Sequence, residues 1–329
     1  MQTATLDVLR HQLEDRRDRL HGAIAVTGAE GDLVQLLQQV DSALARLGTD
    51  DYGLCLVCQG YVDESELIGN PMMRYCLCDL SPAQQKSLEH DLELATRIQS
   101  ALLPDPDLVA DRWEAHYRYE PSGPVSGDYC DFWVEPDGDG TLFFALGDVS
   151  GKGVAASLLM AHLQAAFRSL PAGSLPLPEL VARVNRQLMA ASIPTHYATL
   201  VAGRAAPDGR VELVNAGHCL PLVARGRSRR VEEVPSTGLP VGLFADRPYE
   251  AVRFDLEADD ALVLYTDGLT EARNDGGAEY GQEGVTRHLG RGRDGSARAI
   301  VRGLRGDLAD FLGGAPRADD LTILALRRV

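Results

Sequence analysis

The chain has 329 residues, of which 45% are hydrophobic and 24% are charged, the balance of an ordinary soluble globular protein with room for more than one domain. Its formal net charge of −16 excludes a general binder of nucleic acid or of membrane surfaces, because both need a positive field. No apolar run approaches the ~20 residues of a membrane helix, and the N-terminus lacks a signal-peptide core, so a cytoplasmic protein is expected.

Two helices are predicted at the N-terminus. Residues 5–25 and 32–48 carry apolar side chains at helical spacing, and the segment VTGAEGD between them breaks the pattern with two glycines. The pattern predicts a helical hairpin, either a plain helical pair or one with a role of its own.

Four of the six cysteines follow this hairpin closely. They are Cys55, Cys58, Cys76 and Cys78. In a reducing compartment such a cluster indicates a metal site rather than disulfides. The pattern C-x-x-C, seventeen residues, then C-x-C is close to that of a two-knuckle zinc site, which would stabilise a small loop-rich module.

The segment YGLCLVCQ…NPMMRYCLC, with Pro71 before the second pair, resembles the zinc finger of the DksA/TraR family, and the helical pair resembles that family's coiled-coil hairpin. The resemblance covers residues 5–85 and implies one structural Zn²⁺. The family's second pair is C-x-x-C, whereas Asp79 stands at that position here, so either Cys78 or Asp79 is the fourth ligand. The family's acidic hairpin tip enters RNA polymerase. Here the tip has Glu30 and Asp32 but the hairpin is short, which favours a sensory or docking module over polymerase binding.

A third helix is predicted over residues 86–103, ended by Pro104 and Pro106. From residue 112 short β-rich runs alternate with helical stretches at 153–170, 177–191 and 297–312, which predicts an α+β domain of sheets and helices. The predicted organisation is therefore an N-terminal module (1–85), a linker helix (86–110) and a C-terminal domain (111–329).

The loop GDVSGKG between an apolar run and a helical pattern suggests a nucleotide-binding phosphate loop. A Walker loop needs four residues between its glycines and a hydroxyl residue after its lysine. Here three residues separate Gly147 from Gly151, and Gly153 follows Lys152. The nucleotide interpretation is therefore rejected.

Aspartates instead mark several strand ends of the C-terminal domain. They lie in SGDYCDF (Asp128, Asp131), LGDVSGKG (Asp148), YTDGLTEARN (Asp267) and RADDLTIL (Asp319, Asp320). Carboxylates from several strand ends repel one another unless a cation neutralises them, and hard oxygen ligands of this kind favour Mg²⁺ or Mn²⁺ over zinc.

These motifs, together with ATLVAGR, LVNAGHCLPLV and GLPVGLF, occur in the order seen in PPM-type metal-dependent serine/threonine phosphatases, and they resemble the SpoIIE/RsbU branch over residues 112–329. The resemblance implies a β-sandwich flanked by helices, with two Mn²⁺ or Mg²⁺ ions at one end. The ligands that it implies are Asp128, Asp148, the backbone carbonyl of Val149, Asp267 and Asp319. It places Asp131 and Asp320 in supporting or water-mediated roles.

Other residues near these motifs receive no catalytic role. His218 in NAGHC is interpreted as structural, Cys130 and Cys219 have no activating motif around them, and Lys152 stays unassigned. The chain departs from the branch at SGD, where GGD is frequent, and at NAGHCLP, where NAGHxPP is commoner. Neither departure removes an implied ligand.

The sequence thus predicts a phosphatase that hydrolyses phosphoserine or phosphothreonine with metal-activated water and no protein nucleophile. By resemblance, its substrate is a phosphorylated regulatory protein such as an anti-sigma-factor antagonist, and the linker helix pairs in a homodimer that controls the metal site. The alternative is a DksA/TraR-like regulator that binds RNA polymerase and carries an idle phosphatase-like domain.

Overall fold

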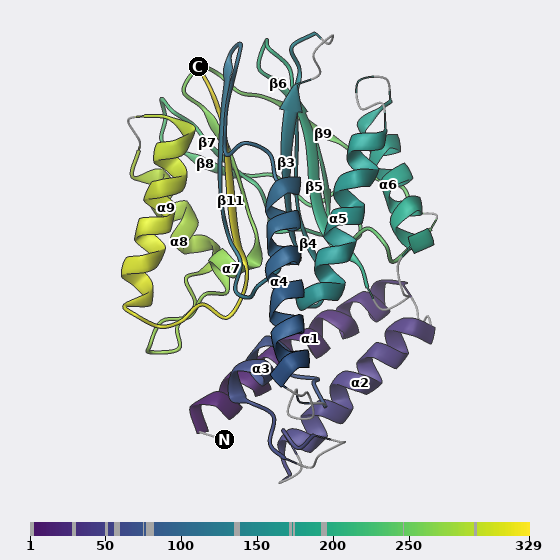
Figure 1. Cartoon of the computed structure of the whole chain (residues 1–329). Coiled ribbons are helices and arrows are strands. Elements are labelled where there is room, and N and C mark those ends of the chain that lie inside the picture. The colour runs from purple at the N-terminus through teal and green to yellow at the C-terminus, as the bar shows by residue number, and fades with distance from the viewer. Residues whose placement is uncertain are drawn as a thin grey trace. The chain divides into compact units, whose positions relative to one another are not determined.

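The computed structural model describes residues 3–27, 31–49, 52–55, 60–74, 76, 82–134, 139–170, 173, 175–191, 196–245, 247–292 and 295–329. The chain divides into two compact units, Met1–Leu94 and Ala95–Val329 (Figure 1). The division falls inside the helix predicted as a linker, while the predicted boundaries at residues 85 and 110 stay predictions.

The helices are α1 (Thr3–Thr27), α2 (Gly31–Leu47), α3 (Glu64–Gly69), α4 (Pro82–Leu102), α5 (Gly153–Ser169), α6 (Leu177–Ala191), α7 (Asp267–Thr270), α8 (Gly281–Gly290) and α9 (Ala297–Leu312). The strands are β1 (Asp107–Ala110), β2 (Trp113–Glu120), β3 (Asp128–Val134), β4 (Leu142–Val149), β5 (Ala198–Ala205), β6 (Arg210–Ala216), β7 (Leu222–Ala224), β8 (Val231–Glu233), β9 (Val252–Asp255), β10 (Ala261–Tyr265) and β11 (Leu321–Arg328). Over the described residues, no helix combines the length and the apolar character that crossing a membrane requires.

In the first unit, α1, α2 and α3 pack around a small core. Its buried members include Leu9, Leu47, Tyr52, Cys55 and Leu67. A short hairpin follows α2, in which Cys55 N–H donates to Gly60 O at 2.9 Å and Val62 N–H donates to Gly53 O at 2.7 Å. The two N-terminal helices occupy the ranges that the apolar spacing predicts, because each buries its leucine stripe.

The second unit contains two antiparallel sheets, as the predicted α+β sandwich requires. One sheet has the strand order β1-β2-β11-β10-β7-β8 and the other the order β3-β4-β5-β6-β9. In Figure 1, α8 and α9 lie beside the first sheet and α5 and α6 beside the second. In strand β2 apolar residues alternate with polar ones over WEAHYRYE, so its pattern has the period of two residues of a half-buried strand and contains no apolar run.

Strand alternation sorts the side chains of this unit into three layers. On β4, Leu142, Phe144 and Leu146 face the core between the sheets. Phe143 and Ala145 face the opposite way, into a core shared with α5 and α6. A third core lies between the other sheet and helices α8 and α9. Successive residues of a strand point to opposite faces, so position along each strand decides which layer a side chain enters.

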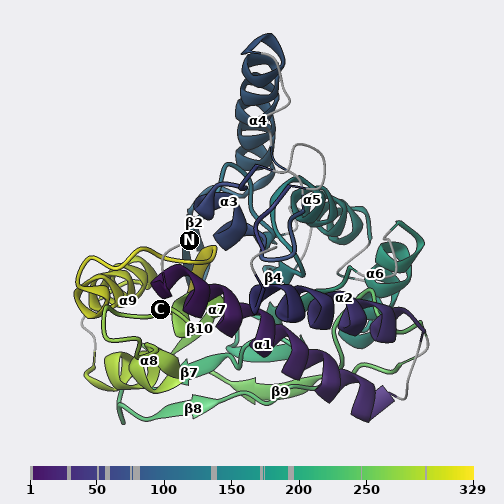
Figure 2. The same ribbon diagram turned by 90° about the horizontal axis from the view of Figure 1, so that it is seen from below.

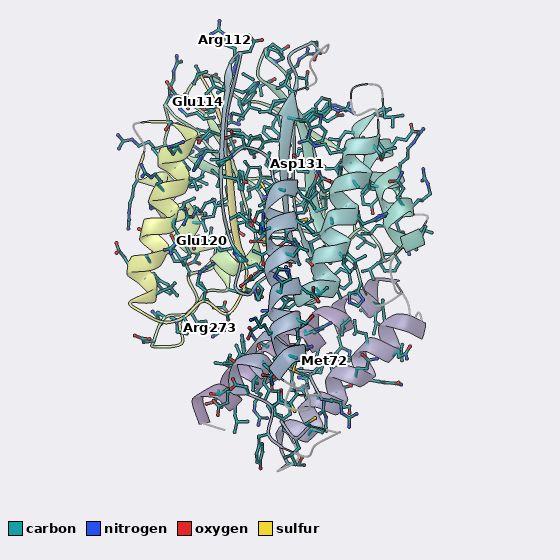
Figure 3. All side chains as sticks on the ribbon, in the orientation of Figure 1. Met72, Arg112, Glu114, Glu120, Asp131 and Arg273 are labelled. Atoms are coloured by element: carbon teal, nitrogen blue, oxygen red, sulfur yellow. The ribbon has the colours of Figure 1, made fainter. Side chains whose placement is uncertain are left out.

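Charged and capping groups fix the helix that covers the first sheet. Figure 3 labels Glu120 at the end of β2, whose carboxylate lies 3.0 Å from Arg305 Nε on α9. The Ser296 hydroxyl accepts the N–H of Ala299 at the start of α9, and Gly313 ends the helix in the left-handed conformation at φ 62°. The prediction of a helix over 297–312 matches these bounds.

Candidate metal centre at one end of the sandwich

Two of the predicted aspartates lie opposite each other on neighbouring strands. Asp128 opens β3 and pairs in register with Asp148 near the end of β4. Asp128 lies two residues from Cys130 on β3, and Asp148 lies two residues from Leu146 on β4, and both of these neighbours belong to the core between the sheets. The two aspartate side chains are therefore directed between the two sheets, at the end of the sandwich.

Two more aspartates reach this end from the other sheet. Asp267 begins α7 directly after β10, and Asp319 lies just before β11, the strand that pairs with β10. A Cβ on Gly268 would stand 1.8 Å from the carbonyl oxygen of Asp320, so only glycine allows this close approach of the two segments. Figure 2 gives a second view of α7 beside β10.

Two buried threonines hold Asp128, and the sequence prediction missed both. The hydroxyls of Thr266 and Thr322 each donate to Asp128 Oδ2, at 3.0 Å and 2.5 Å. Thr322 N–H also donates to the hydroxyl of Thr266 at 2.9 Å, which ties the two segments together. The available signal was the position of each threonine inside an aspartate motif, YTDG and DDLT.

Asp320 holds the loop that leads into Asp128. Its Oδ1 accepts the N–H and the hydroxyl of Ser122 at 2.6 Å and 2.9 Å, and its Oδ2 accepts the N–H of Gly127 at 3.1 Å. A buried carboxylate that accepts three hydrogen bonds restrains the residues around it. Asp320 therefore positions the segment 122–127.

Helix α4 holds the same loop from the other side. The buried side-chain amide of Gln99 donates to Ser126 O at 2.7 Å and accepts Ser126 N–H at 2.9 Å. The Thr96 hydroxyl donates to Pro124 O at 2.6 Å. Ser126 in turn accepts the N–H of Asp128 with its hydroxyl at 3.0 Å. These contacts connect α4 with the first aspartate of the cluster, and the sequence prediction did not include Gln99.

The structure does not bring Asp131 to this cluster. Asp131 stands three positions after Asp128, so alternation turns it to the opposite face of β3, toward α5. There it accepts two hydrogen bonds from Arg168, at 2.7 Å and 2.5 Å, and the Arg168 guanidinium lies 4.5 Å from the ring centroid of Trp133. Figure 3 labels Asp131. Its contacts hold α5 on the sheet, in place of the expected supporting role at the metals.

The clustered carboxylates raise one another's pKa. Burial, followed by the charge of Asp320, raises the pKa of Asp128 well above its usual range. Burial, followed by the charge of Asp267, does the same to the pKa of Asp148. Burial also raises the pKa of Asp319, and Lys152 opposes that rise. Such a set is costly when ionised without a cation.

The sequence model of the family "Stage II sporulation protein E (SpoIIE)" matches residues 138–329, more than half of the chain. The chain belongs to the SpoIIE family. This SpoIIE-family chain is 25% identical over 248 residues to the phosphoserine phosphatase RsbU of Bacillus subtilis, covering 74% of this chain and 72% of RsbU. It is 25% identical to Protein IcfG of Synechocystis over 270 residues, which are 72% of this chain and 41% of IcfG.

Solved structures agree on the fold of the second unit. The SiaA-PP2C domain of Pseudomonas aeruginosa superposes with a TM-score of 0.63 at 21% identity, covering 75% of this chain and 98% of that domain. The structure of the RsbU and RsbW domains of Rv1364c from Mycobacterium tuberculosis gives a TM-score of 0.55 at 26% identity, over 69% of this chain and 61% of that one. The second unit is a PPM-type phosphatase domain.

The donor set of this SpoIIE-family domain fits divalent cations. Its oxygens are hard, its carboxylates are mutually repulsive, and a Cβ on Gly127 would stand 2.9 Å from the carbonyl oxygen of Val149, which places that carbonyl beside the loop preceding Asp128. No three acidic, histidine or cysteine side chains of the described ranges converge as a completed metal cage. Asp128 is instead hydrogen-bonded to two threonines, and the Asp319 carboxylate lies 3.0 Å from Lys152 Nζ.

The side chain of His218, interpreted from the sequence as structural, does not itself hold the turn in the NAGHC motif. Asn215 holds that turn: its Oδ1 accepts His218 N–H at 2.8 Å and its Nδ2 donates to His218 O at 3.2 Å. The His218 Nδ1 lies 2.7 Å from the Thr199 hydroxyl. Burial lowers the pKa of His218 to about 4, so the ring is neutral at physiological pH.

Of the predicted zinc ligands, Cys55 and Cys76 are described, whereas Cys58, Cys78 and Asp79 lie outside the described residues. The N–H of Cys76 donates to Cys55 Sγ at 3.3 Å, so these two cysteines of the first unit meet across twenty intervening residues. Cys76 is disulfide-bonded in this structure.

Proposed function

We propose that this chain is a metal-dependent phosphatase that hydrolyses phosphoserine or phosphothreonine in a regulatory protein. The observation that carries the proposal is the arrival of Asp128, Asp148, Asp267 and Asp319, from four separate segments, at one end of a PPM-type sandwich. The relatives RsbU and RsbP, both named phosphoserine phosphatases, support the reaction class.

Asp128, Asp148, Asp267, Asp319 and the Val149 carbonyl would hold two Mn²⁺ or Mg²⁺ ions. When bound, such ions lower the pKa of a coordinated water and stabilise the charge on the phosphoryl oxygens. Thr266 and Thr322 orient Asp128, which limits its freedom before any ion arrives. Burial raises the pKa of Cys130 well above its usual range, so that thiol stays protonated and is not a nucleophile.

The test is Mn²⁺-dependent release of phosphate from a phosphoserine protein by the purified chain. Asp148→Ala and Asp267→Ala should each reduce the rate to that measured with a metal chelator, because each removes an oxygen ligand. Asp310→Ala, at an exposed position of α9, serves as the control. Ordinary activity in either ligand variant would refute the site.

The substrate that we propose is a phosphorylated anti-sigma-factor antagonist, a protein of the partner-switching type. Support comes from the similarity to RsbU and RsbP and to a structure that combines RsbU and RsbW domains. Incubation with a phosphoserine-bearing antagonist should release its phosphate faster than incubation with the same protein after denaturation. Equal rates on both would argue against recognition of a folded partner.

We also propose that the first unit holds one Zn²⁺ through Cys55, Cys58, Cys76 and either Cys78 or Asp79. Support comes from the Cys76 N–H donating to Cys55 Sγ, which brings two of the proposed ligands together although they are distant in the sequence. Protein purified under reducing conditions should contain one zinc per chain, and Cys55→Ser should lose it. Absence of zinc in the reduced wild type would refute this site.

The chain is further proposed to form a homodimer through α4. Leu94 and Ile98 stand four residues apart on that helix and are 45% and 56% exposed, an apolar face that a second helix could cover. Ile98→Glu should convert the dimer to a monomer in light-scattering measurements. A wild-type monomer at micromolar concentration would contradict the proposal.

Binding of RNA polymerase, the alternative function, gains no support from the described residues. Glu30 and the side chain of Asp32, which form the acidic tip, lie outside them. Retention of the reduced, zinc-loaded chain on immobilised polymerase would revive this alternative, and its absence would eliminate it.

A further inference from the structure

Lys152 makes two contacts with the segment that carries Asp319. Its Nζ lies 3.0 Å from Asp319 Oδ2 and donates to the carbonyl oxygen of Ala318 at 2.8 Å. The two side chains are only 27% and 42% exposed. The ammonium is therefore coordinated by one carboxylate and one carbonyl oxygen, the same kinds of hard oxygen donor that a divalent cation takes.

The backbone around Lys152 directs it across the end of the sandwich. Lys152 is the N-cap residue of α5, in extended conformation, and its side chain does not cap the helix. Gly151 and Gly153 on either side have φ of 96° and 73°, a region that favours glycine, so the chain turns sharply on both sides of the lysine.

The segment that receives Lys152 is itself anchored to the other sheet. Arg317 donates to Glu120 O on β2 at 3.0 Å, and Asp320 accepts the N–H of Ser122. Ala318 and Asp319 lie between these two anchors. Lys152, which follows β4 of the opposite sheet, thus connects the two sheets at the end of the sandwich where the aspartates cluster.

Lysine is a rare residue in this chain. Among its 32 lysine and arginine residues, Lys86 and Lys152 are the lysines, and every other one is an arginine. Arginine presents a broad planar fork, whereas lysine presents a compact point charge on a flexible stem. The compact ammonium of a flexible lysine side chain can move away from Asp319 more easily than a guanidinium, which suits a position where a metal ion is proposed to bind.

We propose that Lys152 is an internal cation that competes with the divalent metal for Asp319, so that metal entry releases the lysine. This inference rests on the proposed metal centre and adds a determinant of its affinity. Lys152 holds the segment of Ala318 and Asp319 in place through its two contacts and occupies one carboxylate oxygen of Asp319. A bound ion takes over the Asp319 oxygen and displaces the ammonium.

The first test is calorimetric titration of Mn²⁺ into the full chain at fixed pH and ionic strength. Lys152→Met should bind Mn²⁺ about two- to fivefold more tightly than wild type, the scale of a partly exposed ion pair. Lys86→Met makes the same change of charge at the other lysine, which is exposed on α4, and should match wild type. Lys152→Arg keeps the charge and should lie closer to wild type than to Lys152→Met.

The outcomes separate this inference from the proposed function. If wild type binds Mn²⁺ and Lys152→Met binds no more tightly than Lys86→Met, the competition is refuted while the metal centre stands. If wild type binds no Mn²⁺ at all, both fail. Weaker binding by Lys152→Met would also overturn the inference, because it would make the lysine a supporter of the metal.

A second test observes the lysine directly. In a Lys86→Arg background, Lys152 is the only lysine, so selective ¹³C labelling gives one side-chain Cε signal. Saturation with diamagnetic Mg²⁺ should move this signal to the position that Asp319→Asn gives without metal, since both remove the ion pair. A signal that Mg²⁺ leaves in place, while calorimetry reports binding, would overturn the inference.

Discussion

Asp128 is only 1% exposed, so the groups packed around it determine how it can bind a metal. Oδ2 is occupied by two threonine hydroxyls, which leaves Oδ1 as the oxygen with capacity for an ion. Hydroxyl donors stabilise the ionised form of a buried carboxylate, against the burial that raises its pKa. The two threonines therefore belong to the metal centre although neither need touch a metal.

Removal of one of these hydroxyls should weaken the metal centre. Thr322→Val keeps the shape of the side chain but removes the donor, and we expect Mn²⁺ affinity to fall by about 10–100-fold, the usual effect of losing a partner of a metal ligand. Thr322→Ser restores the hydroxyl and should recover most of the affinity. Calorimetric titration of both variants checks this, and equal affinities in Val and Ser would contradict it.

At the scale of elements, helix α4 acts on the site through the backbone of one loop. The side-chain amide of Gln99 pairs with both the N–H and the C=O of Ser126, and the carboxylate of Asp320 accepts the backbone N–H groups of Ser122 and Gly127. The loop 122–127 is thus hydrogen-bonded to α4 on one side and to the segment before β11 on the other. A shift of α4 would move Ser126, which lies two residues before Asp128, and would therefore move Asp128 as well.

Removing the hydrogen bonds between α4 and the loop 122–127 should make this loop more mobile. Gln99→Met fills similar space but leaves the N–H and C=O of Ser126 without partners, at a cost of about 1–3 kcal/mol for a buried unsatisfied group. Hydrogen exchange of residues 122–127 should accelerate and Mn²⁺ affinity should fall. Arg97→Met introduces the same side chain at an exposed position of α4 and should change neither. Unchanged exchange in Gln99→Met would show that α4 does not control the loop.

On the scale of the whole molecule, the two sheets are held together by an apolar core that ends in a cluster of like charges. Leu146, Leu264 and Leu324 belong to that core, and the same strands or their extensions carry Asp148, Thr266 and Thr322. The apolar packing supplies the free energy that holds the carboxylates together in spite of their repulsion. We therefore expect the repulsion between the carboxylates to lower the free energy of unfolding of the domain when no cation is bound.

Because of this repulsion, we expect that replacing Asp148 by a neutral residue stabilises the domain while it removes a proposed metal ligand. Its folded-state pKa is raised, so its contribution to stability is present below the pKa of the unfolded chain and is lost as pH rises through the folded pKa. At pH 7.5, with chelator present, Asp148→Asn should raise Tm, each ~1 kcal/mol being worth about 2–4 °C in a domain of this size.

The gain should shrink as pH falls below the raised pKa, where the wild-type carboxyl is also neutral. Added Mn²⁺ should stabilise wild type more than Asp148→Asn, because a ligand that binds only the folded state raises its stability. Thermal unfolding across pH, with Asp310→Asn as an exposed control, measures both effects. A lower Tm for Asp148→Asn at pH 7.5 would contradict the predicted repulsion.

Much of the fold could be predicted from local pattern. The helices 177–191 and 297–312 were predicted at the bounds that the structure gives, because each carries an apolar stripe at helical spacing. Strands such as β2 and β9 are harder to predict, because they mix polar and apolar residues. Their partners in the sheet, distant in sequence, make them strands.

The sequence by itself determined which segments carry the chemistry, because each aspartate sits in a short motif whose glycines and threonines are its immediate neighbours. Only the tertiary structure decided which of these side chains meet. Strand alternation turned Asp131 away to Arg168, and the packing of two sheets brought Thr322 to Asp128 and Lys152 to Asp319. Those contacts join residues more than 30 positions apart, so the local spacing of residues cannot predict them. They depend on the register of the paired strands and on the packing of the core between the two sheets.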